Sequence, residues 1–197
     1  MTISSQKRTI LGMGRIESRK TRLKTGAELV IRTAETRDAA AILEHATKII
    51  AEDSYNITTQ GELDMTVEQE QVWIEKRLNN PANIILLAEV DGCMAGMAHF
   101  ENGSRRRTAH KGIVRLNINK RFRRKGVGIT LLESVIDWAR DNPVIEKLCL
   151  SVFANNEPAI ALYKKAGFIE EGRYIKEVKL APGQYVDMVR MCRFVTD

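Results

Sequence analysis

The sequence has few cysteines and histidines and no long hydrophobic run. Its 197 residues include three cysteines and three histidines, and no Cys-x-x-Cys pair occurs. This composition argues against a zinc site and a disulfide framework, so we expect no metal site. Cys93, Cys149 and Cys192 each lie in an apolar stretch, and we expect three buried side chains in a reducing cytoplasm. No apolar run reaches the about 18–20 residues that cross a bilayer, so we expect no membrane segment.

Positive charge is distributed unevenly along the chain. The sequence has 31 basic and 25 acidic side chains, a net charge of +6. Residues 1–27 contain seven basic side chains and one acidic, so they carry the whole excess, and residues 28–197 are neutral. A nucleic-acid-binding domain needs a basic face on its folded part, so we expect no nucleic-acid partner. Because its apolar residues are isolated, segment 1–27 predicts a flexible basic extension, with a transit peptide or a phosphate-binding arm as alternatives.

Hydrophobic periodicity predicts a single domain over residues 28–197, of the α/β or α+β class. Apolar residues that alternate predict strands, and a period near 3.6 predicts helices. The expected strands cover residues 28–33, 83–90, 93–101, 110–119, 146–153, 168–178 and 184–195. The expected helices cover residues 36–53, a segment opened by the Thr66–Gln69 capping box, residues 126–140 and residues 156–166. This order predicts a mixed central sheet of about seven strands flanked by about four helices.

The segment 118–129 joins the end of an expected strand to the start of a helix. It is rich in arginine and lysine, and Gly126 and Gly128 allow its backbone to approach a ligand closely. The first turn of a helix has unpaired N–H groups and partial positive charge, which is typical of a binding site for the pyrophosphate of a cofactor. The segment lacks the Gly-Lys-[Ser/Thr] ending of a P-loop and the third glycine of the dinucleotide fingerprint.

Two motifs resemble those of the GNAT superfamily of N-acetyltransferases. Arg123-x-x-Gly126-x-Gly128 is similar to the family signature [Gln/Arg]-x-x-Gly-x-[Gly/Ala], whose backbone amides hold the pyrophosphate of acetyl-CoA. The segment Asn156–Phe168 is similar to the second family motif, Asn-x-x-Ala-Ile-x-Leu-Tyr-x-Lys-x-Gly-Phe. The resemblance covers residues 28–197 and implies a GNAT fold for them.

The resemblance also implies roles for individual residues. It implies acetyl transfer from acetyl-CoA, as a co-substrate, to an amine, with Tyr163 as the acid that protonates the CoA sulfur. The cofactor-binding residues that it implies are Leu116, Asn117 and Ile118 in the strand, Arg123, Arg124, Lys125, Gly126, Val127, Gly128 and Ile129 in the loop, and Asn156 beside the pantetheine. Position 124 is often Gly in the family, and Arg124 adds a charge near the phosphates. The alternatives are a Tyr163 that only packs and an Asn156 that only caps its helix.

The acceptor and the general base stay open. A small amine, such as a polyamine or an amino acid, and a protein N-terminal amine are alternative acceptors. A non-catalytic acyl-CoA-binding regulatory module is the alternative function, and a homodimer is left open. Acids in or beside the loop 54–65 would suit a cationic amine or form a solvated surface: Glu52, Asp53, Glu62 and Asp64. The base is a water relay or one of four side chains: Glu89, His99, Glu101 or His110.

Overall fold

An eight-stranded sheet forms the centre of the domain. The computed structural model describes residues 14–52 and 54–196. The strand order is β1-β2-β3-β4-β5-β6-β8-β7, and only β5 and β6 are parallel neighbours. The strands are β1 (Arg19–Arg22), β2 (Glu28–Thr33), β3 (Ile84–Val90), β4 (Cys93–Asn102), β5 (Lys111–Ile118), β6 (Lys147–Phe153), β7 (Ile169–Ala181) and β8 (Gln184–Phe194).

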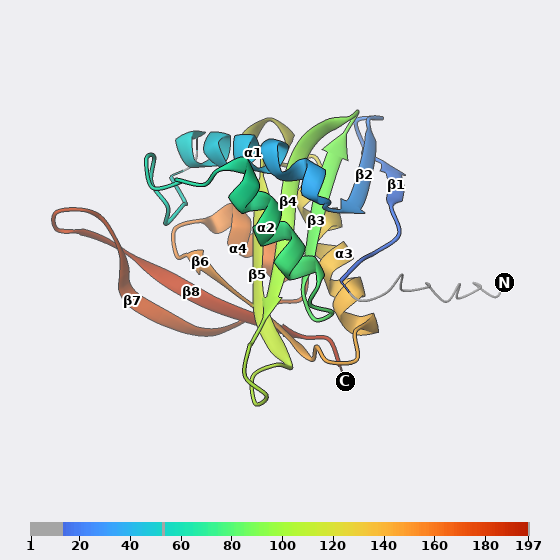
Figure 1. The fold of residues 1–197 in the computed structure, drawn as a ribbon. Helices are drawn as coiled ribbons and strands as arrows, with labels where there is room; N and C mark the ends of the chain where they lie inside the picture. The colour runs from blue at the N-terminus through green and yellow to red at the C-terminus, as the bar shows by residue number, and fades with distance from the viewer. Residues whose placement is uncertain (1–13, 53, 197) are drawn as a thin grey trace.

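Four α-helices cover the two faces of the sheet. They are α1 (Ala39–Glu52), α2 (Val67–Leu78), α3 (Val127–Asp141) and α4 (Glu157–Lys165), with short 3-10 turns at Thr36–Asp38 and Lys120–Phe122. Figure 1 shows α1 and α2 in front of the sheet and α3 behind it. The predicted mixed sheet with four helices is confirmed, with one strand more than expected.

Alternation along the strands divides the core into two clusters. Even-numbered residues of β4 and β5, such as Phe100 and Val114, pack against Leu131 and Trp138 of α3. Odd-numbered residues of β3 and β4 pack instead against the apolar faces of α1 and α2: Ile85, Leu87 and Met97 against Ile42, Ile74 and Leu78. The odd-numbered face of β5 is therefore on the side of α1 and α2, which matters for the site below.

The expectation of a flexible extension over residues 1–27 is wrong for the part that the structure describes. Residues 19–22 form β1, which pairs antiparallel with β2. Leu23 is only 8% exposed and belongs to the core cluster, and Ile16 packs against the same cluster. The domain therefore begins before residue 28. Residues 1–13 lie outside the described part of the chain.

Local sequence signals account for several boundaries. The Thr66 hydroxyl accepts from the Gln69 N–H, and the Gln69 side chain accepts from the Thr66 N–H, which confirms the capping box that opens α2. Asp91 and Gly92 have φ of 48° and 77°, as a type I′ turn between β3 and β4 requires. Cys93, next in the chain, is exposed, so the expected burial of all three cysteines is wrong at this turn position.

Candidate active site

The parallel strands β5 and β6 separate partway along their length. Their register pairs are confined to residues 111–113 of β5 and 147–149 of β6. Beyond Ile113 and Cys149 the two strands diverge, so one edge of β5 has no strand beside it over residues 114–118. We call this opening the β5–β6 split. Among the described residues no strand pairs with this edge, so an extended ligand can pair with it as an added strand would.

The N-terminus of α3 lies at the wide end of this split. Gly126 caps the helix in the left-handed region, with φ of 95°, and no side chain caps the first turn. A Cβ on Gly128 would be 3.4 Å from a methyl of Leu162 and 3.5 Å from Ile118 Cγ1, so the first turn of α3 packs closely between β5 and α4. The unpaired N–H groups and the positive end of the helix therefore face a ligand that leaves the split. This placement suits the pyrophosphate of an acyl-CoA.

The two arginines that precede Gly126 act differently. The Arg123 Nε donates to the Ile118 carbonyl at 3.0 Å, which ties the loop to the end of β5. Arg124 has φ of 59°, in the left-handed region that glycine adopts without steric cost. This backbone conformation explains why a glycine is common at position 124 in the family. Arg124 and Lys125 are exposed at the helix N-terminus, where both add positive charge.

Tyr163 lies on the buried face of α4. Its side chain is 9% exposed, and its ring is 6.0 Å from the ring of Phe168, centroid to centroid. Burial raises the pKa of Tyr163 to about 12, so its hydroxyl keeps its proton at physiological pH. A protonated phenol is a hydrogen-bond donor, which is the state that an acid for a departing thiolate requires.

Asn156 begins α4 as the capping motif predicts. Its Oδ1 accepts from the Ala159 N–H at 3.2 Å, and Pro158 occupies the first turn, where no N–H is needed. The Tyr55 hydroxyl donates to the Asn155 carbonyl at 3.4 Å and brings the segment after α1 next to this helix start. The contact of Leu162 with the position of Gly128 places α4 beside the first turn of α3.

Comparison with known proteins agrees with this arrangement. The sequence pattern of the Acetyltransferase (GNAT) family matches residues 45–168. The L-amino acid N-acetyltransferase AaaT of Escherichia coli K12 is 32% identical over 167 residues, which is 85% of this chain and 98% of that protein. The chain belongs to the GNAT family. It is an N-acetyltransferase, and its acetyl donor is acetyl-CoA.

Other GNAT relatives and solved structures agree with this fold. The spermidine N(1)-acetyltransferase of Escherichia coli K12 is 30% identical over 61% of this chain and 63% of its own length. A GNAT-family acetyltransferase from Streptococcus pneumoniae has a TM-score of 0.82 and 28% identity, over 85% of this chain and 99% of that one. The yncA structure from Salmonella typhimurium, solved with acetyl-CoA, has a TM-score of 0.76 and 21% identity, over 86% of this chain and 95% of that one.

Three of the four candidate bases, Glu89, Glu101 and His99, are engaged in other contacts. Glu89 binds Arg32 at 2.5 Å, and Glu101 binds Arg77 at 3.0 Å. His99 is 7% exposed, and burial, followed by the charges of Arg115 and Arg77, lowers its pKa to about 3. A base of that strength is poorly matched to an ammonium group at neutral pH. The structure therefore favours none of these three as the base.

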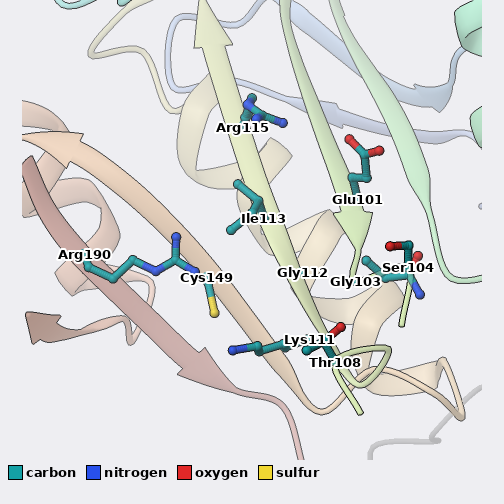
Figure 2. A pocket seen from close by; sticks show the side chains of 11 residues that line it. Glu101, Gly103, Ser104, Thr108, Lys111, Gly112, Ile113, Arg115, Cys149 and Arg190 are labelled. Carbon is teal, nitrogen blue, oxygen red and sulfur yellow. The ribbon is translucent and has the colours of Figure 1, made fainter. Parts of the chain in front are cut away.

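A cavity that sequence reasoning missed opens beside the β5–β6 split. Its volume is about 340 Å³, and it is lined by the β4–β5 turn and by residues of β4, β5, β6 and β8 (Figure 2). The only sequence signal was the alternation that places Ile113, Arg115 and Asn117 on one face of β5. Arg190 of β8 lines the same cavity, and no local pattern predicts that contact.

The described residues contain neither a metal-binding group nor a membrane-spanning helix. No cluster of three or more histidine, cysteine or acidic side chains with metal-binding geometry occurs in 14–52 and 54–196. Over the same residues, no helix is long and apolar enough to cross a bilayer.

Proposed function

We propose that this enzyme transfers an acetyl group from acetyl-CoA directly to a primary amine while both substrates are bound. The observation that carries the proposal is the β5–β6 split, with a helix N-terminus at its wide end and Tyr163 on α4. An extended pantetheine chain fits a split strand edge, and a pyrophosphate fits the N-terminus of α3. The cavity beside the split, on the side of the sheet opposite α3, would receive the acceptor.

The residues proposed to hold the cofactor fall into three groups. The first group is Leu116, Asn117 and Ile118: the backbone groups of Leu116 and Ile118 would face the split, although the Ile118 carbonyl already accepts from Arg123, while Asn117 between them is the register partner of Met97 in β4. The backbone amides of residues 126–129 would receive the pyrophosphate, with the charges of Arg124 and Lys125 beside it. Arg123 holds the loop on β5, and the Asn156 side chain caps α4 next to the pantetheine.

Tyr163 is proposed as the acid for the leaving thiolate. The neutral acceptor nitrogen forms a bond to the thioester carbon and releases one proton to water, the carbon–sulfur bond breaks, and the Tyr163 hydroxyl gives its proton to the sulfur. The raised pKa of Tyr163, about 12, keeps the donor form populated but makes a full transfer less favourable than from an ordinary tyrosine. The resulting phenolate recovers a proton from solvent before the next turnover.

The acceptor is proposed to be a small amine or a protein N-terminal amine. Relatives of this chain are named L-amino acid N-acetyltransferase, spermidine N(1)-acetyltransferase and N-alpha-acetyltransferase. These names support an amine acceptor and favour an enzyme over a non-catalytic acyl-CoA-binding module. They do not select one acceptor class.

Steady-state kinetics with two varied substrates tests this proposal. CoA release is measured against acetyl-CoA and a panel of amino acids, spermidine and peptides. We expect intersecting double-reciprocal plots, which indicate a ternary complex. Parallel plots, or an acetylated enzyme trapped by mass spectrometry, would contradict direct transfer. If acetyl-CoA binds and no amine in the panel is acetylated, the transferase proposal itself is wrong.

A cytoplasmic location and a homodimer also stay proposals. The free cysteines Cys149 and Cys192 support a reducing compartment. The β7–β8 hairpin projects from the body of the domain (Figure 1) and exposes apolar side chains that a second copy could cover: Ile169, Tyr174, Ile175, Leu180 and Tyr185. Sedimentation velocity tests the dimer, and cell fractionation tests the location.

A further inference from the structure

The cavity beside the β5–β6 split adjoins the place where the thioester is expected. Ile113 and Cys149, the last register partners of β5 and β6, both line it. Arg115 also lines it and directly precedes Leu116, the first residue of β5 assigned to the cofactor. The cavity therefore lies within one residue of the strand segment assigned to the cofactor, on the face of the sheet opposite α3.

Positive charge dominates the lining of this cavity. Three cations, Lys111, Arg115 and Arg190, line it together with one acid, Glu101 (Figure 2). Glu101 is already bound by Arg77, at 3.0 Å. No acidic side chain of the described residues lies within ion-pair distance of Arg115.

Arg190 is only loosely held by an acid. Its Nε lies 3.9 Å from the Glu171 carboxylate, and its Nη1 donates to Ser151 Oγ at 3.4 Å. Glu171 itself binds Lys147 at closer range, and this contact lowers the Glu171 pKa. Arg115 is exposed and Arg190 is partly exposed, so both guanidinium groups can meet a ligand from solvent.

A buried histidine orients one of these arginines. Arg115 Nη1 lies 3.4 Å from His99 Nε2, and the His99 ring packs edge-on against Trp73, 5.3 Å between centroids. A guanidinium only donates, so Nε2 accepts and the proton of the neutral ring is on Nδ1. Nδ1 is buried and has no hydrogen-bond partner among the described residues, so the Arg115 contact is the polar contact of this ring.

We propose that this cavity binds a carboxylate of the amine acceptor, with Arg115 and Arg190 as the recognising side chains and His99 as a positioning residue for Arg115. The inference rests on the proposed acetyl transfer. A planar carboxylate matches the fork of a guanidinium, and the amine of an α-amino acid is only one carbon away from its carboxylate. An amino acid held on Arg115 would thus present its nitrogen at the split beside Leu116.

The acids near the loop 54–65 do not offer a competing cation site. Glu62 accepts from the Thr59 N–H at 2.6 Å and so stabilises its own turn. Glu52 and Asp64 are exposed, and neither lines the cavity. Asp53 lies outside the described residues. A polyamine would instead meet the three cations, which repel it.

The experiment compares acceptors that differ only at the carboxylate. For alanine, leucine, methionine, phenylalanine and lysine, the free L-amino acid, its α-amide and the amine without the carboxyl carbon are assayed for CoA release. Because one charged contact is lost, we expect kcat/KM to fall by about 10- to 100-fold from the amino acid to the amide. Spermidine and two C-amidated peptides, one with Asp at its second position, complete the panel. The peptide pair distinguishes a free amino acid from an acidic N-terminus as the source of the carboxylate.

Variants connect the preference to named side chains. Arg115→Gln and Arg190→Gln should each lower kcat/KM for the preferred carboxylate acceptor about 10- to 100-fold, while its amide changes little. Arg115→Lys keeps the charge and loses the fork, so we expect a smaller fall. Arg106→Gln is the matched control, because Arg106 is exposed on the same β4–β5 turn and lies outside the cavity lining. His99→Gln should raise KM for the carboxylate acceptor and leave kcat and the amide unchanged, whereas a purely structural role would affect both acceptors equally.

The outcomes distinguish a failure of the carboxylate site from a failure of the proposed acetyl transfer. A free amino acid preferred over its amide, with the preference lost in Arg115→Gln, supports the carboxylate site. Preference for the Asp peptide, lost in the same variant, supports the site and assigns it to an acidic N-terminus. Spermidine or amides acetylated as well as amino acids would overturn the carboxylate site and leave acetyl transfer standing. No acetylation of any amine by enzyme that binds acetyl-CoA would overturn both.

Discussion

Ile113 and Cys149 are the last residues that β5 and β6 share as register partners, and beyond them the sheet is split. The split leaves an unpaired strand edge in the middle of the sheet, where a strand ordinarily has a neighbour on both sides. On one side of this edge lies the N-terminus of α3, and on the other lies a cavity with three cationic side chains. A single interruption of one strand pair would thus provide both the proposed donor site and the proposed acceptor site.

The loop at the N-terminus of α3 yields the first prediction. Gly126→Glu should weaken acetyl-CoA binding by roughly 10- to 100-fold, because its carboxylate repels the pyrophosphate at the helix N-terminus. Isothermal titration calorimetry measures the change. Adding a Cβ to a glycine in the left-handed region also lowers the free energy of unfolding. The matched control is therefore Gly183→Glu in the β7–β8 turn, where φ is 77°, compared with 95° at Gly126. Equal affinities in two folded variants would contradict pyrophosphate binding at this loop.

The hydroxyl of Tyr163 yields the second prediction. Tyr163→Phe keeps the ring and its contact with Phe168 and removes only the proton donor. We expect kcat to fall by about 10²–10⁴-fold with little change in acetyl-CoA affinity, since general acid catalysis contributes on that scale. Single-turnover acetyl transfer at saturating acetyl-CoA measures the chemical step free of product release.

A control and a contradicting result complete this test. Tyr185→Phe removes a hydroxyl from an exposed tyrosine of the β7–β8 hairpin and should leave the rate unchanged. A Tyr163→Phe enzyme that matches the wild type across the pH range would show that Tyr163 only packs.

Local chemistry made the elements around the proposed cofactor site predictable. The signature around Gly126, the Asn156 cap and the Thr66 capping box are short patterns whose geometry is set by neighbouring residues, and each occupies its predicted element. The left-handed backbone at Arg124 was not expected, because an arginine gives no sign of positive φ.

The parts that could not be predicted depend on contacts between distant segments. β1 has the sequence Arg-Lys-Thr-Arg, which shows no apolar alternation, and its register with β2 alone makes it a strand. The cavity needs Arg190 of β8 to lie across β6 from Arg115, and this neighbourhood follows from strand order. Strand order in a mixed sheet is not encoded in any local window.

The N-terminal segment yields the third prediction. Leu23 is buried, and a Cβ on Gly126 would be 3.7 Å from its Cδ2, so Leu23 packs against the cofactor loop. Leu23→Ala should lower the free energy of unfolding by about 2–3 kcal/mol, at the lower end for a buried leucine near the surface. Because the loop loses its support, acetyl-CoA affinity should fall as well. Urea unfolding and calorimetry measure the two effects.

An exposed site provides the control for Leu23. Ile57 is 67% exposed, and Ile57→Ala should change the free energy of unfolding by less than about 0.5 kcal/mol. If Leu23→Ala is as stable as Ile57→Ala and binds acetyl-CoA normally, the segment before residue 28 is an accessory to the fold rather than part of it.

Burial of His99 yields the fourth prediction, which concerns pH. In the unfolded chain an imidazole takes up a proton near pH 6.5, as an ordinary histidine does. In the folded protein the pKa of His99 is lowered to about 3, first by burial and then by Arg115 and Arg77. Between these values the unfolded state binds more protons, so stability falls as the pH falls through this window. From pH 7 to pH 5, His99 alone should cost the fold about 2 kcal/mol.

His99→Gln isolates this contribution, because glutamine does not titrate. Urea unfolding of both proteins at pH 7, 6 and 5 gives the pH dependence of each. Burial also lowers the pKa of His45, which adds to the acid sensitivity, while burial raises the pKa of Glu70, which opposes it. Both groups are present in both proteins, so their effects cancel in the difference. We expect the wild type to lose about 2 kcal/mol more than His99→Gln between pH 7 and pH 5. Parallel pH profiles would mean that His99 is protonated in the folded protein, and a protonated ring could not accept a hydrogen bond from Arg115.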